Sequence, residues 1–313
     1  MDFLLLLIGL AGLWFGTEVT IRGAVSVAKR FGVSEFIVGV AILSIGSDLP
    51  ELAIAIDGAI KNLNEGDASG VIVGSALGSS LGQIGFVLGV VALMSLLTLP
   101  RGTVYRHGSI LLGSLVLLAL VGYDGQVTRN EGFVLLLLYG VYFVALLSEV
   151  NGGNGADGKT RLATFRSVVY LLVGLAVVVG SADLTVSSAL NVAETLDISD
   201  TFVAIVIIGL GTSLPELTIS IGAVLKGRNR MSVGNLIGSN IFDTLVPIGA
   251  AAVIAGLSFD RGMLRFELPY LFVLSAVVLF FFARKGGIQR REAAVILGMY
   301  GVYVAVKVYD LGG

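Results

Sequence analysis

Two glutamates of this chain each follow a proline directly inside a strongly apolar stretch. The segment GSDLPELAIAI contains Pro50 and Glu51, and the segment GTSLPELTISI contains Pro215 and Glu216. Placing a carboxylate in the hydrocarbon core of a bilayer costs at least about 2.5–3.5 kcal/mol, so an intramembrane acid indicates a functional site. If these stretches cross a membrane, the two glutamates are therefore candidate cation ligands.

The prolines also predict a break in each helix. Proline has no backbone N–H and clashes with the carbonyl four residues earlier, so the helix is interrupted there. We expect the break to free backbone carbonyls, including Ser44 in the first motif and Gly209 in the second. Ser47, Thr212 and Ser213 add hydroxyl oxygens beside the glutamates. Broken helices are tolerated at membrane depth only where they line a cavity walled by protein, so both motifs are predicted to face one.

Two further segments, GSALGSS and GNLIGSN, are predicted to form other walls of this cavity. Their glycines recur every four residues, a spacing that lets helices approach closely. Polar residues four apart lie on one face of a helix. Two such pairs follow these glycines, Ser79 with Gln83 and Ser239 with Asp243.

The oxygen-rich composition of these motifs favours a hard cation. Ca²⁺ takes six to eight oxygen ligands in a flexible shell, whereas zinc and copper prefer His or Cys. The chain contains no Cys, and its one histidine, His107, is predicted to be a solvated residue of a cytoplasmic loop. The same shortage of His and Cys argues against an enzyme and against a bound cofactor. The sequence therefore predicts a site for transported Ca²⁺, Na⁺ or both.

Composition identifies the membrane as the environment. Apolar residues make up 56% of the 313 positions, charged residues make up 13%, and the mean hydropathy is +0.95. Soluble domains carry about 25% charged residues. Apolar runs near the length of about 20 residues that spans a bilayer recur throughout. They predict an all-α polytopic membrane protein with ten transmembrane helices, at about 3–28, 35–60, 69–98, 108–123, 131–149, 166–192, 199–225, 231–257, 266–283 and 291–308.

The chain contains an internal repeat. Residues 9–57 align with residues 174–222 at an offset of 165, which matches Glu51 with Glu216, and the glycine segments align at an offset of 160. Five spans in each copy force the second copy into the membrane upside down. Inverted repeats are the architecture of secondary transporters, with the site at the midplane. The predicted domains are a first five-helix repeat at 1–150, a cytoplasmic linker at 151–165 and a second, inverted five-helix repeat at 166–313.

The basic residues predict the orientation. With the N-terminus outside, 14 of the 20 Lys and Arg residues fall in inside loops and five in outside loops. Short loops rich in Lys and Arg stay cytoplasmic. Both termini are therefore predicted to be extracytoplasmic in a cell (inner) membrane. A net charge of −2 argues against a nucleic-acid partner, and no obligate protein partner is indicated beyond the lipid bilayer. Glu18 and Arg22 are four apart and are predicted to form a salt bridge.

The motifs GSDLPEL, GTSLPEL and GNLIGSNIFD resemble the alpha repeats of the cation/Ca²⁺ exchanger superfamily, and most closely those of prokaryotic Na⁺/Ca²⁺ exchangers. The resemblance covers nearly the whole chain and implies exchange of Ca²⁺ for Na⁺ by alternating access. It also implies roles for individual residues. By that resemblance, Ca²⁺ is bound by Glu51, Glu216, Ser47 and Thr212; Na⁺ contacts Ser213, Ser79, Ser239 and the carbonyls of Ser44 and Gly209; and Asp243 matches the family's acid on the eighth span.

Two residues depart from the pattern of that superfamily. Asp48 stands where a small residue such as Ser is usual, and Gln83 stands where Asn is usual. An additional carboxylate beside Glu51 changes the charge of the site, which leaves the coupling ion open. The second functional hypothesis is therefore an exchanger that couples the transport of Ca²⁺ or another divalent cation to H⁺. A passive cation channel is a remote third hypothesis, because channels are usually rings of identical subunits and this chain carries two different copies of the motif.

Overall fold

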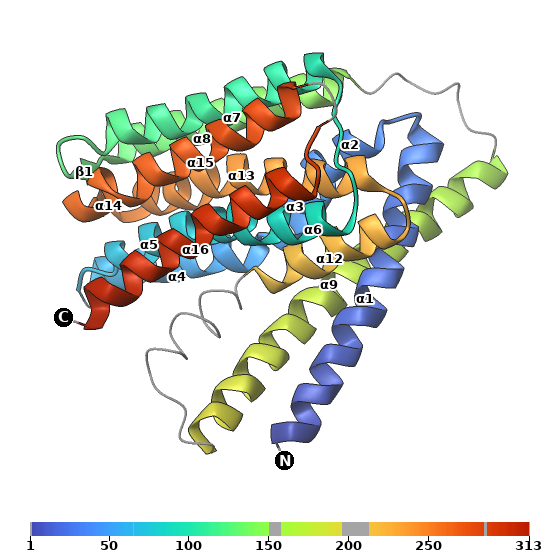
Figure 1. Ribbon diagram of the computed structural model, residues 1–313, viewed down its shortest axis with the longest axis horizontal. Coiled ribbons are helices and arrows are strands. Elements are labelled where there is room, and N and C mark those ends of the chain that lie inside the picture. The colour runs from blue at the N-terminus through green and yellow to red at the C-terminus, as the bar shows by residue number, and fades with distance from the viewer. Residues whose placement is uncertain (1, 65, 150–157, 196–212, 285–286, 313) are drawn as a thin grey trace.

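The computed structural model describes residues 2–64, 66–149, 158–195, 213–284 and 287–312, and these are almost entirely helical (Figure 1). The helices of the first part of the chain are α1 (Asp2–Phe31), α2 (Glu35–Val38), η1 (Gly39–Leu43), α3 (Ser44–Ser47), α4 (Leu49–Asn64), α5 (Ser69–Leu81), η2 (Gly82–Val87), α6 (Leu88–Met94), α7 (Arg101–Val121) and α8 (Arg129–Ser148), where η1 and η2 are π-helical. Those of the second part are α9 (Gly158–Thr195), α12 (Leu214–Leu225), α13 (Asn229–Ala255), α14 (Arg261–Arg265), α15 (Glu267–Ala283) and α16 (Arg290–Gly312).

Most of the predicted spans are present as long apolar helices. Within the described residues, eight helices are long and apolar enough to cross a membrane, and the bent pair 35–47 and 49–64 makes a possible ninth. The prediction of an all-α polytopic membrane protein is confirmed. Of the predicted span at 199–225, only the part from Ser213 onward lies among the described residues, as α12.

The prediction for His107 was wrong. Helix α7 begins at Arg101, seven residues before the predicted start of that span, so His107 lies within the helix rather than in a loop. Its side chain is buried, its Nδ1 lies 2.9 Å from the hydroxyl oxygen of Tyr142, and its ring centroid lies 4.8 Å from that of Phe36. His107 therefore joins three helices, α7, α8 and α2, inside the bundle.

Helix α13 runs through the centre of the helical bundle and packs against α8, α4, η1 and α5 (Figure 1). Its glycines allow this close packing. A Cβ atom at Gly234 would collide with the backbone of Phe36, and one at Gly238 would lie 2.7 Å from the Cα of Val40. The predicted close approach at these small residues is confirmed for α13 against α2 and η1.

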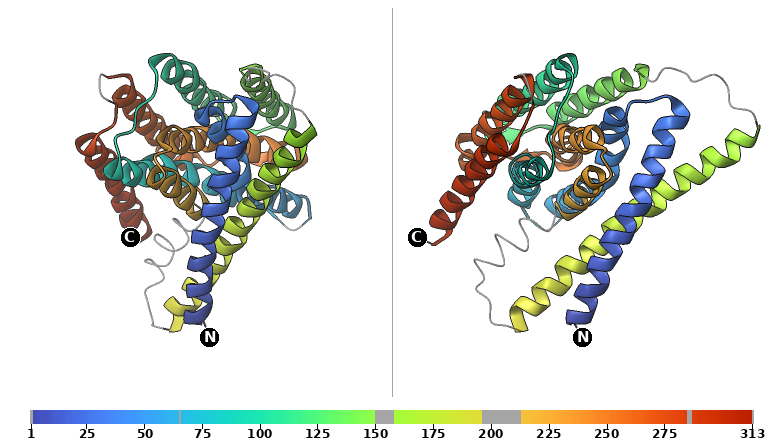
Figure 2. Two further views of the ribbon diagram at one scale, coloured as in Figure 1. Left: turned by 90° about the vertical axis from the view of Figure 1, so that its right-hand side faces the viewer. Right: turned by 45° about the vertical axis from the view of Figure 1, so that its right-hand side comes forward.

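Helices α1 and α9 cross as an antiparallel pair at one side of the bundle (Figure 2). A Cβ atom at Gly9 would collide with Thr185, and one at Gly174 would collide with Thr20. The offset of 165 between the two repeats relates Gly9 to Gly174 and Thr20 to Thr185. The two close contacts are therefore the same contact made once by each half of the chain.

The threonine hydroxyls of this crossing repeat in the same way. The Oγ1 of Thr20 donates a hydrogen bond of 2.8 Å to the carbonyl of Gly16, and the Oγ1 of Thr185 donates one of 2.7 Å to the carbonyl of Ser181. Both bonds join residues four apart, and the offset of 165 converts one into the other. The contacts between α1 and α9 thus follow a local two-fold relationship.

Two short extended pairings flank α7 in the sequence. Strands β1 (Gln126–Val127) and β2 (Leu257–Ser258) pair antiparallel, with Val127 opposite Leu257. An isolated antiparallel bridge joins Leu97 to Ile288. Because an offset of 160 matches Leu97 with Leu257, these pairings also occupy corresponding places in the two halves. They fasten the chain just before and just after α7.

Candidate cation site

The first helix break falls at Asp48. Helix α3 ends at Ser47, Asp48 has φ −88° and ψ 7°, and α4 begins at Leu49, so the two helical segments meet at a bend of 44°. The π-helix η1 directly precedes α3, and such π-bulges occur frequently at functional sites. Glu51 lies buried in the first turn of α4. A carboxylate is favourable there because it faces the positive end of the helix dipole.

The described part of the second motif has the same local geometry. Ser213 has φ −91° and ψ 8°, α12 begins at Leu214, and Glu216 lies fully buried in its first turn. Pro215 fits the first turn because the N–H that it lacks has no partner within the helix. Thr212 and Gly209, the other predicted ligands of this motif, lie outside the described residues.

The carbonyl of Ser44 is not left free by the break. It accepts hydrogen bonds from the backbone N–H of Asp48 at 2.9 Å and from the Oγ of Ser47 at 3.3 Å. The reason is that the helix continues through Ser47 and is interrupted only at Asp48. The N–H missing at Pro50 leaves the carbonyl of Gly46, four residues earlier, without its helical donor.

A chain of hydrogen bonds connects two of the buried acids. The Oγ of Ser79 donates to the Oε1 of Glu51 at 3.3 Å. The Nε2 of Gln83 donates to the Oγ of Ser79 at 3.1 Å and to the Oδ2 of Asp243 at 3.2 Å. The Nδ2 of Asn240 donates to the Oε1 of Gln83 at 2.8 Å. The predicted shared face of Ser79 and Gln83 is confirmed, and it points at Glu51 and Asp243.

Asn240 was not among the predicted site residues, although it lies beside Ser239 in the GNLIGSN segment. Its amide also donates to the carbonyl of Leu236 at 3.0 Å, so its Nδ2 group is fixed by two acceptors. This fixed donor selects the orientation of the Gln83 amide, which then presents its NH₂ group to the serine and the acid. No periodic pattern in the sequence predicts the contact between Gln83 and Asn240, because these residues are 157 positions apart.

Many oxygens of the site are buried without a hydrogen-bond donor. A buried carboxylate is stable only when another group compensates its charge and its lone pairs. Among the described residues, the buried oxygens that lack a partner include Asp48 Oδ1 and Oδ2, Glu51 Oε2, Glu216 Oε1 and Oε2, Asp243 Oδ1, Ser213 Oγ and Ser239 Oγ. Such a set of acceptors matches the ligand requirements of a hard cation.

Among the described residues, no Lys or Arg forms a salt bridge with these acids. Asp48, Glu51, Glu216 and Asp243 are each at most 2% exposed, and Asp48 lies within electrostatic range of the other three. The buried side chains of the described part of the chain include no Lys and no Arg. The four carboxyl groups must therefore be balanced by ions or protons taken from solution.

The acids do not form a compact cage of three carboxylates. Across the described residues, no three His, Cys, Asp or Glu side chains converge closely enough to hold a metal ion. A cation at this site would therefore need neutral oxygens beside one or two carboxylates. The buried hydroxyls of Ser47, Ser213 and Ser239 provide such oxygens.

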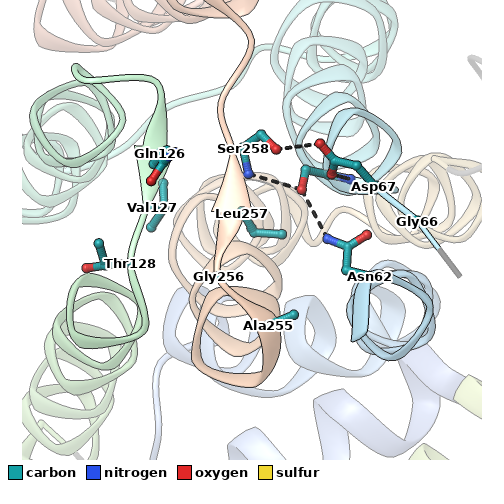
Figure 3. A pocket seen from close by; sticks show the side chains of 11 residues that line it. Asn62, Gly66, Asp67, Gln126, Val127, Thr128, Ala255, Gly256, Leu257 and Ser258 are labelled. Carbon is teal, nitrogen blue, oxygen red and sulfur yellow. Dashed lines mark hydrogen bonds between the residues drawn. The ribbon is translucent and has the colours of Figure 1, made fainter. Parts of the chain in front are cut away.

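A separate polar pocket of about 320 Å³ lies where α4, α13 and the two strands end (Figure 3). Asp67 accepts hydrogen bonds there from the Oγ of Ser258 at 2.5 Å and from the backbone N–H of Ser69 at 2.9 Å. The hydrogen bond from Ser258, followed by those from Ser69, lowers the pKa of the Asp67 carboxyl. These bonds tie the loop after α4 to strand β2.

A multi-pass helical protein with four buried acids, two of them beside a broken helix, belongs to the class of membrane ion-transport proteins. Residues 1–148 and 166–309 match the sodium/calcium exchanger protein family, and the chain belongs to this family. The membership confirms the superfamily predicted from the sequence and supports the Na⁺/Ca²⁺ exchange that the motifs predicted.

Relatives and solved structures agree with this membership. The chain is 28% identical to the sodium/calcium exchanger MaX1 of Methanosarcina acetivorans, over 99% of each chain. It is 31% identical to a membrane protein of Methanocaldococcus jannaschii, over 96% of this chain and 95% of the relative. Structures of the sodium-calcium exchanger NCX_Mj superpose with a TM-score of 0.85 at 28% identity, covering 97% of both chains.

Proposed function

We propose that this chain is a secondary active antiporter that exchanges Ca²⁺ for Na⁺ by alternating access. The observation that carries the proposal is the set of four buried acids with no buried Lys or Arg among the described residues. A site of this charge is stable only when it is loaded, because an empty one leaves several carboxylates uncompensated in a medium of low dielectric constant. Obligatory loading is what an antiporter requires, since its site must change sides with one ion or the other.

The proposed ligands follow from the motifs and from the buried oxygens. Glu51 and Glu216 share Ca²⁺, helped by the hydroxyls of Ser47 and Thr212. Asp243 is held by Gln83 at the α13 wall and contributes its free Oδ1. The proposed Na⁺ contacts are the hydroxyls of Ser79, Ser213 and Ser239, the carbonyl of Gly209 and the carboxylate of Asp48; the carbonyl of Ser44 is excluded because it already accepts two hydrogen bonds.

We further propose the ten-span inverted repeat as the architecture, with halves at 1–150 and 166–313 and a cytoplasmic linker at 151–165. The repeated Gly–Thr contacts between α1 and α9 support it, because they run antiparallel. The matching backbone conformations of Asp48 and Ser213 support it as well. The distribution of Lys and Arg favours extracytoplasmic termini.

Asp48 supports a second candidate, H⁺-coupled Ca²⁺ exchange. Both of its carboxylate oxygens are buried without a donor among the described residues. A carboxylate can carry a proton through a transport cycle, whereas the hydroxyl usual at this place in the superfamily cannot.

Ca²⁺ uptake into liposomes that contain the purified chain tests these proposals. An outward Na⁺ gradient should drive uptake at equal pH on both sides, and an outward H⁺ gradient without Na⁺ should not. Uptake driven only by H⁺ would establish the second candidate instead. Uptake that needs neither gradient and follows the Ca²⁺ gradient alone would indicate a channel. Glu51→Gln serves as the inactive control in each condition.

A further inference from the structure

A pocket rich in basic side chains opens beside α1, at the end of α12. It has a volume of about 360 Å³ and combines apolar side chains of α1 with positively charged ones of both segments. We call it the basic pocket. Its cationic lining residues are Arg22, Lys29, Lys226 and Arg228.

The basic pocket keeps a net positive charge. Glu18 accepts from the Nε of Arg22 at 2.6 Å, as the sequence predicted, and from the Nζ of Lys226, also at 2.6 Å. Arg228 pairs with a carboxylate at the start of α2 at 2.6 Å. No salt bridge joins Lys29 to another of the described residues. Only two carboxylates thus pair with the four cationic side chains of the basic pocket, and the remaining positive charge can bind an anion.

An apolar groove continues from the basic pocket along the same two helices. It has a volume of about 270 Å³, and Lys226 belongs to the lining of both. Its walls are mainly apolar side chains of α1 and α12. They include Leu10, Leu13, Trp14, Ile221 and Leu225. Trp14 and Leu225 are 76% and 72% exposed, so the groove opens sideways to the membrane rather than into the bundle.

The two cavities lie end to end along α1. From Lys29 in the basic pocket to Trp14 in the groove, α1 rises about 22 Å at 1.5 Å per residue. One leaflet of a bilayer, headgroups included, is about 20–23 Å thick. The charged end and the apolar end are therefore separated by the distance that separates the headgroup of a lipid from the end of its acyl chain.

We propose that the basic pocket and the apolar groove together bind one anionic phospholipid. Its phosphate lies among the cations of the basic pocket, and an acyl chain lies in the groove between α1 and α12. The charge favours an anionic headgroup, because a zwitterionic one brings its own cation beside Lys29 and Arg228. The groove favours a lipid over a soluble phosphate, because only a lipid covers Trp14 and Leu225.

Native mass spectrometry of the full chain in detergent tests the proposal. Dioleoyl phosphatidylglycerol should bind as a single saturable molecule, more tightly than dioleoyl phosphatidylcholine. Each cation near a membrane surface contributes about 1 kcal/mol to the binding of anionic lipid. Lys29→Gln should therefore weaken phosphatidylglycerol binding about five-fold. Arg101→Gln, at an exposed position at the start of α7, is the matched control and should leave the affinity unchanged.

Further arms of the experiment separate the possible ligands. Glycerol 3-phosphate, the headgroup chemistry without acyl chains, should compete poorly at equal concentration. Because Lys29 forms no salt bridge with a described residue, Lys29→Gln should melt at the wild-type temperature in phosphatidylcholine micelles. Equal binding of the two phospholipids would overturn the proposal, as would full affinity in Lys29→Gln. Competition by glycerol 3-phosphate as strong as that by the lipid would also overturn it and assign the pocket to soluble phosphate.

Discussion

Asp48 and Ser213 adopt the same backbone conformation, with φ and ψ of −88° and 7° in the first and −91° and 8° in the second. Each residue directly precedes the helix that carries a buried glutamate in its first turn. The conformation lies in the sparsely populated bridge region, where active-site residues are often found. The two positions are thus alike in backbone and differ in chemistry, since Asp48 presents a carboxylate and Ser213 a hydroxyl.

Asp48→Ser makes the two breaks chemically equivalent. If Asp48 binds a cation or a proton during the cycle, the variant should show a changed dependence of Ca²⁺ uptake on Na⁺, on pH, or on both. Uptake measured against Na⁺ concentration at several pH values between about 5 and 9 checks this. Asp57→Ser, which changes an exposed acid of α4, is the matched control. Wild-type curves for both ions would show that Asp48 is a bystander.

Glu51→Gln and Glu216→Gln should each abolish Ca²⁺ uptake. Glutamine keeps the size of the side chain but removes the charge that balances the ion, so either change disables a shared site. The double variant should be no worse than either single one, because the two residues act as a unit. Uptake in either single variant above about a tenth of wild type would contradict a shared site. Asp57→Asn controls for the loss of an exposed acid.

Asn240→Ala should slow exchange without preventing folding. It removes the donor to Gln83 Oε1 that fixes the amide facing Ser79 and Asp243. An unmade hydrogen bond of a buried group costs about 1–3 kcal/mol, which corresponds to about 5–150-fold in uptake. Asn240→Asp should be at least as damaging, because it replaces the donor with an acceptor.

Two measurements decide whether Asn240 acts through Gln83. Asn130→Ala, at the exposed start of α8, should leave uptake unchanged. In a Gln83→Ala background, Asn240→Ala should add little further loss. Independent, additive losses would mean that Asn240 only supports the packing of α13.

Single cysteines at Asp67 and Asn154 should react with a membrane-impermeant reagent from opposite sides. The proposed inverted repeat would place Asn154 in the cytoplasmic linker and Asp67 outside. The chain has no native cysteine, so each introduced thiol is labelled alone. Labelling of both positions in intact cells would contradict the predicted orientation.

Ser258→Ala should make the stability of the protein depend less on ionised Asp67. The pKa of Asp67 is lowered in the folded protein, so its ionised form stabilises the fold above its ordinary pKa. This contribution is lost as the pH falls through the lowered value. The variant should therefore melt below wild type near neutral pH, and the difference should shrink in acid. A difference that is constant with pH would mean that Ser258 acts only by packing.

Local patterns in the sequence were sufficient to predict the membrane class, the break beside Glu51 and the face shared by Ser79 and Gln83. Each of these depends on residues within a few positions of one another. His107 was misplaced because hydropathy does not fix where α7 begins, and Arg101 and Arg106 shortened the predicted apolar run. The contact of Glu18 with Lys226 joins α1 to the end of α12, 208 residues later. Only the tertiary packing of the helices brings those two residues together.

The apolar groove contains a natural reporter. Trp14 lines it and is the only tryptophan in the chain, so the intrinsic tryptophan emission of the whole protein arises from this one wall. A lipid with brominated acyl chains would place a heavy-atom quencher against that ring, whereas one bound elsewhere would leave the emission unchanged. Quenching of the tryptophan fluorescence therefore measures how much of the groove is occupied by lipid. The measurement needs no added label and can be made while ions are exchanged.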